Sequence, residues 1–347
     1  MKKILVAMSG GVDSAAACVL LRQQGYEVGG GTMLLRGGGE GELQDARRAA
    51  EQLHIPFHAF DLRTAFFERV ITPFMRVYQS GGTPNPCVVC NSVMKFGLFL
   101  EKALELGYDG IATGHYARVF SKDGRFLLKT AADSRKDQTY MLCMLTQHQL
   151  AHTLFPLGEV ISKDATRALA IEAGLELAKK RDSQDICFVP DGDYMAYLTA
   201  NGVIPQQGNF ITPDGQIYGP HRGMEAYTVG QRRGLGLAFG ERVYVLEKRG
   251  TDVVLGEEAA LFSNRVCVKH VNYIPFDKPE GPLRVQAKLR YSPRTANALL
   301  IPTENGCELY FDEPQRAVTN GQTAVFYDGD LVVGGGTICE NNMEEQQ

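Results

Sequence analysis

The first half of the chain alternates short apolar runs with longer segments of helical periodicity. Apolar runs typical of buried strands occupy residues 2–8, 27–35, 57–60 and 110–113. Helical periodicity occupies residues 12–24, 42–53, 64–79 and 91–106. Strands that alternate with helices predict βαβ units, so the expected fold class is α/β with a doubly wound, Rossmann-like parallel sheet.

The second half of the chain has a different pattern. Residues 201–240 are dense in Gly and Pro, with short β-like runs and little helical period. Beyond residue 270, apolar runs alternate with turn residues, which predicts a small antiparallel barrel. We therefore predict three domains: an α/β domain over 1–198, a central β-rich domain over 199–269 and a C-terminal β-barrel over 270–347.

Composition and charge narrow the class of protein. The formal net charge is −4, so a nucleic-acid partner would have to be held by local basic patches. The apolar run at the N-terminus is too short for a signal sequence, and no stretch approaches the roughly 20 apolar residues of a membrane span. The eight cysteines are then expected to be reduced in a cytoplasmic protein, with catalytic or metal-binding roles ahead of disulfides.

A glycine-containing loop separates the first predicted strand from the first predicted helix. It reads Ser9-Gly10-Gly11-Val12-Asp13-Ser14. The glycines allow a tight turn, so backbone N–H groups, the helix N-terminus and the two serine hydroxyls would form a cradle for pyrophosphate. Asp13 is suited to holding Mg²⁺ on the phosphates. The bland alternative is a strand-to-helix turn that serine merely caps, and the spacing fits neither a P-loop nor a dinucleotide fingerprint.

This strand–loop–helix unit resembles the PP-loop of ATP pyrophosphatases, which cleave ATP between its α and β phosphates to adenylate an oxygen. The resemblance implies that the first domain is catalytic and uses ATP and Mg²⁺. It also implies that the end of the second strand and a turn after the fourth flank the adenine and ribose. The implied ATP-binding residues are Ala7, Met8, Ser9, Gly10, Gly11, Val12, Asp13, Ser14, Met33 and Gly114.

Motifs further along the chain narrow the choice among PP-loop enzymes. They are Thr83–Asn91 (TPNPCVVCN) with Lys95-Phe96, Ala112–Arg118 (ATGHYAR), Lys136–Tyr140 (KDQTY), Ser183–Val189 (SQDICFV) and Tyr227–Leu235 (YTVGQRRGL). In this order and over essentially the whole length, the chain resembles the tRNA-specific 2-thiouridylases. The resemblance implies ATP-dependent 2-thiolation of the wobble uridine (position 34) of tRNA, through adenylation of its C2 oxygen and sulfur transfer from a cysteine persulfide.

Two cysteines fit the chemistry of sulfur delivery. A persulfide on Cys187 would bring sulfane sulfur, and its release as sulfide needs two electrons. Cys90 can supply them by attacking Cys187 and forming a transient disulfide. Cys90 directly precedes the helix expected to start at Asn91, and a helix N-terminus favours the thiolate. The other cysteines, apart from Cys87, lie in apolar periodic settings and are expected to pack in cores: Cys18, Cys143, Cys267, Cys307 and Cys339.

The resemblance also implies a binding surface for the anticodon arm. Asn85, Pro86 and Cys87 would line the pocket for the target base, and a persulfide donor or relay protein would load Cys187. The implied tRNA contacts are His115, Lys136, Asp137, Gln138, Arg290, Tyr291 and Gln322. Plainer explanations stay open, because lone basic side chains are commonly solvated surface charges and His115 can serve only a turn hydrogen bond. Arg232 and Arg233 favour a further basic patch.

One position departs from the family pattern. The residue three before the helix-start cysteine is Asp in the familiar members, and here it is Cys87. Three thiolates from Cys87, Cys90 and Cys187 would suit a [4Fe–4S] cluster with one free iron. A redox-active pair of Cys87 and Cys90, or a Cys87 without a role, are the alternatives.

Two other functions remain as alternatives. One is a PP-loop synthetase that adenylates a small metabolite for amide formation, which needs no paired cysteines. The other is a non-catalytic RNA-binding protein, which would consume no ATP in the presence of tRNA.

Overall fold

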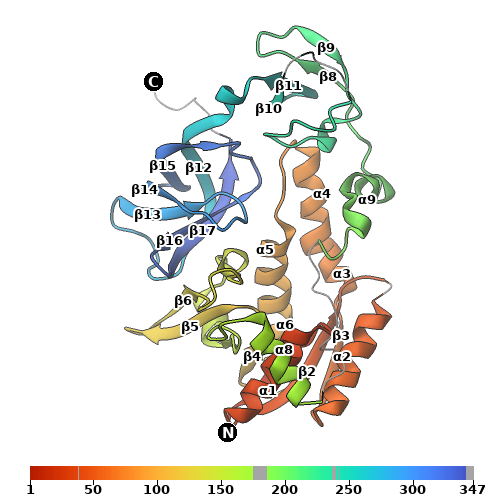
Figure 1. Cartoon of the computed structure of the whole chain (residues 1–347), viewed down its shortest axis with the longest axis vertical. Coiled ribbons are helices and arrows are strands. Elements are labelled where there is room, and N and C mark those ends of the chain that lie inside the picture. The colour runs from red at the N-terminus through yellow and green to blue at the C-terminus, as the bar shows by residue number, and fades with distance from the viewer. Residues whose placement is uncertain (38, 175–185, 237–239, 241, 341–347) are drawn as a thin grey trace.

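The structure, a computed structural model, describes the chain except for residues 38, 175–185, 237–239, 241 and 341–347. Figure 1 shows three parts: an α/β part that holds the N-terminus, a small sheet at the opposite end of the molecule, and a barrel beside the helices that connect the two.

The α/β part is built on a five-stranded parallel sheet with the order β3-β2-β1-β4-β7. From β1 the chain fills one side with β2 and β3 and the other with β4 and β7. The strand order therefore reverses between β1 and β4, which is where doubly wound sheets bind ligands. The predicted doubly wound sheet is confirmed, with strands β1 (Lys3–Ala7), β2 (Glu27–Leu34), β3 (Phe57–Asp61), β4 (Gly110–Ala112) and β7 (Thr153–Leu154).

Helices cover the sheet and extend away from it. Their apolar faces are buried; in α1, for example, Ala15, Ala17 and Cys18 are fully enclosed. The helices are α1 (Val12–Gln23), α2 (Glu40–Gln52), α3 (Arg63–Phe66), α4 (Thr72–Gln79), α5 (Pro86–Cys90), α6 (Phe99–Glu105), α7 (Gln147–Ala151), α8 (Lys163–Glu172) and α9 (Tyr194–Ala200). π-helical segments Phe67–Ile71 and Asn91–Leu98 join α3 to α4 and α5 to α6. Short 3-10 turns occupy Thr139–Leu142, Pro190–Gly192, Met224–Ala226 and Glu258–Leu261.

One predicted helix begins earlier than expected. The helix expected from Asn91 starts at Pro86, because the Asn85 side chain accepts a hydrogen bond from the Val88 N–H (3.4 Å) and caps the helix. Proline at the first helical position has no N–H to leave unsatisfied. Cys90 is therefore the fifth residue of the helix and does not lie at its start.

A hairpin that was not predicted from the sequence follows β4. Strands β5 (Ala117–Lys122) and β6 (Arg125–Thr130) are joined by Asp123 and Gly124, which both have positive φ values (51° and 77°). An Asp-Gly pair is a typical two-residue hairpin turn, so the signal was present in the sequence. The hairpin attaches to the barrel, because Lys129 pairs with Leu331.

The remaining strands form the central sheet and the barrel. The central sheet has the order β10-β11-β8-β9, from β8 (Asn209–Ile211), β9 (Ile217–Pro220), β10 (Tyr244–Arg249) and β11 (Asp252–Gly256). The antiparallel barrel follows the order β12-β15-β14-β13-β16-β17 and closes through β12–β17. Its strands are β12 (Phe262–Tyr273), β13 (Leu283–Lys288), β14 (Ala296–Thr303), β15 (Gly306–Arg316), β16 (Thr323–Asp328) and β17 (Leu331–Cys339). The predicted barrel is confirmed, although β12 begins before the boundary expected at 269/270.

The barrel and the α/β part share a hydrophobic core. Phe99 of α6 and Tyr140 belong to the same buried cluster as Val325 of β16. The Tyr140 hydroxyl donates to the Thr323 carbonyl (2.7 Å), and Asn272 Nδ2 donates to the Cys143 carbonyl (2.9 Å). The barrel is thus packed directly against the α/β part, close to α5.

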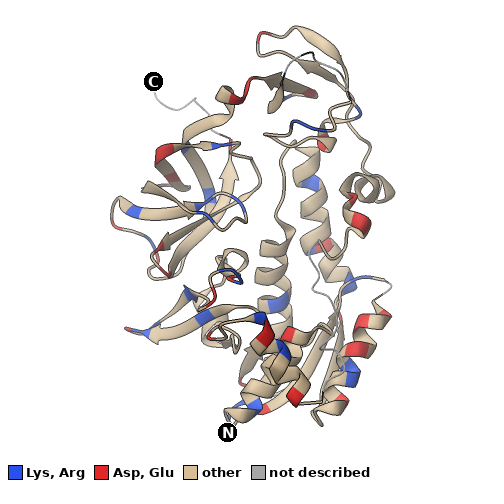
Figure 2. Ribbon diagram, in the orientation of Figure 1, with Lys and Arg blue, Asp and Glu red and all other residues tan. Residues whose placement is uncertain are grey.

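Charged residues of both signs are interspersed over all three parts, as Figure 2 shows. Among the described residues, no helix is long and apolar enough to cross a membrane.

Candidate active site

The predicted phosphate loop lies at the point where the strand order reverses. Ser14 Oγ donates to the Gly11 carbonyl (3.0 Å) and accepts from the Ser9 N–H (3.4 Å), which closes the turn after β1. Gly10 has φ +70°, and a Cβ there would lie 2.8 Å from the Cβ of Asp45. The loop therefore requires glycine at this position for both conformation and space.

Gly114 follows β4 and Met33 lies near the end of β2, and these two strands flank β1. A Cβ on Gly114 would stand 2.8 Å from the Asp13 carbonyl carbon and 2.9 Å from the Ser14 nitrogen, so the turn after β4 touches the turn after β1. Met33 is half-buried near the end of β2, which pairs in parallel with β1. These positions agree with the predicted ATP contacts, which remain a proposal.

We expect Gly114→Ala to impair ATP use without unfolding the chain. The added methyl group would displace the backbone of Asp13 and Ser14, because 2.8 Å is shorter than a carbon–carbon contact allows. ATP–pyrophosphate turnover should fall by about 10-fold or more, since small misplacements of a reacting group are costly. Gly281→Ala is the matched control, because a Cβ there meets nothing within 4 Å. Equal turnover in the two variants would contradict the placement.

Asp13 contacts two residues that were not among the predicted site residues. Lys163 Nζ, at the start of α8, lies 2.7 Å from each carboxylate oxygen of Asp13. The Tyr116 hydroxyl donates to Asp13 Oδ1 (2.9 Å) and contacts Thr166 Oγ1 (2.9 Å). An ammonium group is thereby fixed at the phosphate loop, and Asp13 is its counter-ion.

The three predicted cysteines lie near one another, and two of them, Cys87 and Cys90, belong to α5. Cys90 is buried, Cys87 is half-buried and Cys187 is exposed. They lie close enough to influence one another's ionisation, and the positive charge of Lys95 acts to lower the pKa of all three. Residues 183–185 of the predicted Cys187 motif lie outside the described residues.

An aromatic anchor holds the loop that carries Cys187. The neighbouring Phe188 is buried and packs edge-on against Phe66 (5.6 Å between ring centroids) and Phe74 (5.1 Å), while Tyr197 lies 5.4 Å away. Cys187 itself stays exposed at the surface. This arrangement fixes the loop beside Cys90 while leaving the thiol accessible to an external donor.

The expectation that the helix N-terminus ionises Cys90 is wrong. Burial raises the pKa of Cys90 to about 11, and the opposing effect of Lys95 is smaller. Partial burial likewise raises the pKa of Cys87 and of Cys187, and the charge of Lys95 opposes both shifts. The dipole effect is confined to the first turn, and Cys90 lies beyond it.

The cysteines do not form a ready ligand set for a cluster. Within the described part of the chain, no three His, Cys, Asp or Glu side chains come close enough together to hold a metal ion. Cys87, Cys90 and Cys187 interact without converging on one point, so the residues present do not fit the [4Fe–4S] alternative.

Several predicted tRNA contacts serve the fold itself. Buried Asp137 accepts from the Thr139 hydroxyl (2.7 Å) and the Ala131 N–H (3.1 Å), and Gln138 Oε1 accepts from the Tyr116 N–H (2.9 Å). His115 Nδ1 contacts Thr113 Oγ1 (2.8 Å), and burial holds the pKa of His115 well below its usual range. The turn hydrogen bond of His115 is therefore present. Lys136 is half-buried beside these residues.

Predicted tRNA-binding residues of the barrel lie near the N-terminal end of α5. Gln322 Nε2 donates to the Thr83 carbonyl (3.0 Å), just before Asn85 and the cysteine helix. Tyr291 is exposed, and its ring contacts that of Tyr140 in a tilted arrangement (5.8 Å between ring centroids). Exposed Arg290 donates to the Arg316 carbonyl (2.5 Å). The structure thus places Gln322 against the segment that leads into α5 and Tyr291 against Tyr140, whereas Arg232 and Arg233 lie in a separate exposed loop.

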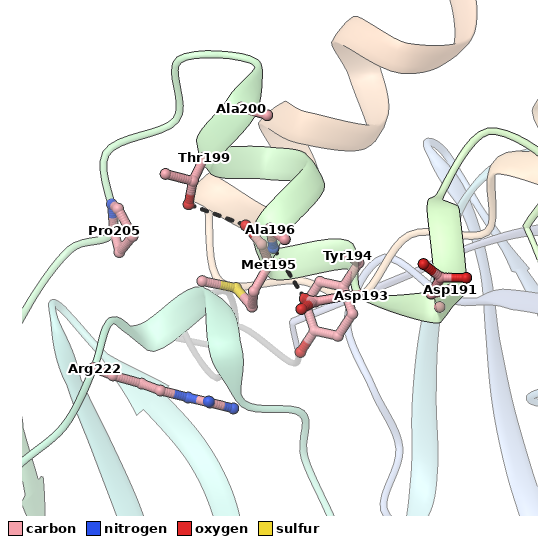
Figure 3. A pocket seen from close by; sticks show the side chains of 10 residues that line it. Asp191, Asp193, Tyr194, Met195, Ala196, Thr199, Ala200, Pro205 and Arg222 are labelled. Carbon is pink, nitrogen blue, oxygen red and sulfur yellow. Dashed lines mark hydrogen bonds between the residues drawn. The ribbon is translucent and has the colours of Figure 1, made fainter. Parts of the chain in front are cut away.

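A cavity of about 960 Å³ opens elsewhere, beside α9 (Figure 3). Tyr194 and Met195 of α9 line it, together with Asp191, Pro205 and Arg222. None of the predicted site residues belongs to its lining, so it does not mark the ATP or base site.

Lys163 and Lys95 are candidate functional residues to which the sequence assigned no role, although Lys95 was noted there as part of a motif. Lys163 occupies the first position of α8, where a positive charge opposes the helix dipole, and that conflict signals a bound partner. Lys95 belongs to the π-helical segment after α5, and such segments are frequent at functional sites.

Three family models match the chain. Their descriptions are tRNA methyl transferase HUP domain over residues 2–191, tRNA methyl transferase PRC-barrel domain over 198–255 and Aminomethyltransferase beta-barrel domain over 263–338. Together they span the three parts of the structure.

Curated relatives match over nearly their full length. tRNA-specific 2-thiouridylase MnmA of Clostridium botulinum (strain Alaska E43 / Type E3) is 46% identical over 97% of this chain and 98% of its own. The protein of the same name from Clostridium perfringens (strain 13 / Type A) is 47% identical with the same coverage. That of Clostridium acetobutylicum is 43% identical over 97% of this chain and 99% of its own.

Proposed function

The chain belongs to the tRNA-specific 2-thiouridylase family, and on that premise we propose that it catalyses ATP-dependent 2-thiolation of the wobble uridine (position 34) of tRNA. The observation that supports this proposal best is the pairing of two sites in one α/β part. A glycine-containing loop suited to binding pyrophosphate follows β1. Cys90, in α5, and Cys187 lie close to each other. A PP-loop synthetase for amide formation needs only the first of these sites.

In the first step the C2 oxygen of uridine attacks the α-phosphate of ATP, and pyrophosphate leaves. The Gly10–Gly11 turn, Ser9 and Ser14 would bind the leaving pyrophosphate, and Lys163 would add a positive charge beside it. Mg²⁺ is commonly bound by one or two carboxylates together with the phosphates, and Asp13 is the carboxylate at this loop. ATP and Mg²⁺ are the cofactors of the proposed reaction.

In the second step a persulfide on Cys187 attacks C2, and AMP leaves with its electron pair. A C2–S–S bond then links the base to Cys187. The Cys90 thiolate attacks the Cys187 sulfur, a Cys90–Cys187 disulfide forms, and the electron pair of the broken bond stays on the sulfur at C2 as the thiocarbonyl. An external thiol reductant restores the enzyme. Because Cys187 is exposed and Cys90 is buried, loading and release fall to different thiols.

We expect sulfur release to accelerate with pH well beyond the usual thiol range. With the pKa of Cys90 at about 11, the thiolate fraction rises about tenfold per pH unit from 7 to 10. Lys95→Met removes the charge that lowers this pKa and should slow release several-fold at pH 8, while Lys95→Arg keeps the charge. Single-turnover release from preloaded Cys187 measures both effects. A plateau near pH 8 would contradict the assignment.

The same pKa shift affects folding stability, with a definite sign. The folded protein holds the Cys90 proton up to about pH 11, whereas an unfolded thiol loses it near the ordinary value of 9.0. The contribution of the buried thiol is therefore complete below about pH 9 and is lost as pH rises toward 11.

We propose a cytoplasmic reaction with two macromolecular partners. One is tRNA, held at its anticodon arm, with Asn85, Pro86 and Cys87 lining the base pocket and Tyr291 and Gln322 at its entrance. Arg290 and Lys136 would bind phosphates, and His115, Asp137 and Gln138 would support that surface from inside. The other partner is a persulfide donor or relay protein that loads the exposed Cys187.

Mass spectrometry of tRNA nucleosides tests the function. The enzyme, ATP, Mg²⁺, tRNA and a persulfide donor should yield 2-thiouridine, with one AMP and one pyrophosphate per sulfur. A protein in which both Cys90 and Cys187 are alanine should yield none. ATP turnover with a small acceptor in that variant would favour the synthetase, and no ATP consumption by the wild type would favour the RNA-binding protein. Full activity of an iron-free preparation would exclude the cluster.

A further inference from the structure

The barrel contains a second pair of neighbouring cysteines, distant in sequence from the thiolation site. Cys267 of β12 and Cys339 of β17 are half-buried, and their sulfur atoms lie 2.6 Å apart. The expectation that both simply pack in a core is wrong, whereas Cys307 of β15 is fully buried as expected.

Strand register explains why these two thiols meet. In the antiparallel β12–β17 pair Cys267 faces Cys339 directly. Residues that face each other in this way have Cα atoms about 4.5–5.5 Å apart, within the range of about 4.4–6.8 Å that a disulfide requires. No movement of the backbone is needed to join them.

The third cysteine of the barrel points to the other face of the sheet. Cys307 faces Val268, the residue after Cys267, and successive residues of a strand point to opposite faces. Val268 and Cys307 are both buried inside the barrel. Cys307 is therefore close to the pair in space but wrongly placed to bond with it.

We propose that Cys267 and Cys339 are a redox modification site, which a peroxide converts into a reversible disulfide. One thiolate attacks a peroxide oxygen, which gives a sulfenic acid and releases one water. The other thiol attacks that sulfur, the S–S bond forms and the second water leaves. Two thiols thus supply two electrons and two protons to hydrogen peroxide, and a dithiol reverses the change.

The two thiols should react slowly with peroxide at neutral pH. Burial and then the neighbouring Cys267 raise the pKa of Cys339 well above its usual value, and the nearby Lys269 opposes this shift. Oxidation should therefore accelerate as pH rises, because the thiolate is the reacting form.

The disulfide would fix a strand end that contacts the active site. Ile338, next to Cys339, donates to the Gln322 carbonyl (2.8 Å) and accepts from the Gly321 N–H (2.9 Å). Gln322 in turn binds the Thr83 carbonyl ahead of the cysteine helix. Oxidation would thus restrain the loop through which the barrel holds that segment.

The test uses the full chain with Cys90→Ser and Cys187→Ser, so that no catalytic disulfide can form. After treatment with hydrogen peroxide and alkylation of remaining thiols, peptide mapping should find Cys267 linked to Cys339, and dithiothreitol should remove the link. Adding Cys339→Ser should abolish the link, whereas adding Cys307→Ser should leave it unchanged.

Three outcomes would overturn the proposal. They are a link that involves Cys307, a link between two chains, or full alkylation of Cys267 and Cys339 after peroxide treatment. The Cys339→Ser single variant should retain wild-type thiolation when reduced, because the pair lies outside the catalytic machinery.

Discussion

Replacing Cys187 by serine should abolish tRNA thiolation with a persulfide donor while adenylation continues. A hydroxyl cannot carry sulfane sulfur, so the rate should fall by about 10³-fold or more. Folding should be unaffected because Cys187 is exposed. Nucleoside mass spectrometry measures the sulfur product, and release of labelled pyrophosphate in the presence of tRNA measures the retained first step.

Cys90→Ser is the informative comparison. This variant should accept labelled sulfur on Cys187 but fail to release it to the base, because no thiol is left to form the disulfide. Label should then accumulate on the protein, or on a protein–tRNA adduct that reductant cleaves. A Cys187→Ser protein that still thiolates tRNA, or a Cys90→Ser protein that takes up no label, would refute the division of roles.

Local sequence was enough to predict the strand, glycine-containing loop and helix in which the proposed phosphate site lies. The apolar run of β1, the glycines and the start of α1 are contiguous, and each follows from short-range sterics and periodicity. The barrel was predictable for the same reason, since its strands alternate with turn residues. The hairpin of β5 and β6 was missed although its Asp123-Gly124 turn is a standard signal.

What the sequence could not predict depends on contacts between distant segments. Lys163 lies 150 residues from Asp13, and only the packing of α8 on α1 brings the two together. The ionisation of Cys90 was mispredicted because its position in a helix is a local property, whereas its burial is not. The contact of Cys267 with Cys339 likewise needs the closure of the barrel.

The second large effect is expected from substitutions in the ion pair of Lys163 and Asp13. Lys163→Met should lower tRNA-dependent pyrophosphate release by about 10²–10³-fold, because a fixed cation beside the leaving phosphates stabilises the developing charge. Loading of sulfur on Cys187 should be unchanged, since that chemistry uses no ATP. Lys163→Arg keeps the charge and should retain more activity than Lys163→Met.

Asp13→Asn separates the positioning of Lys163 from its charge. The Lys163 side chain is only 11% exposed and that of Asp13 31%, so loss of the counter-ion should cost about 1–2 kcal/mol of stability, less than for a fully buried pair. Asparagine can still accept from the Tyr116 hydroxyl but no longer neutralises the ammonium. If the two side chains act as a unit, the double variant should release pyrophosphate no more slowly than Lys163→Met alone. Fully additive losses would show instead that Asp13 acts apart from Lys163, as a direct ligand of Mg²⁺ on the phosphates.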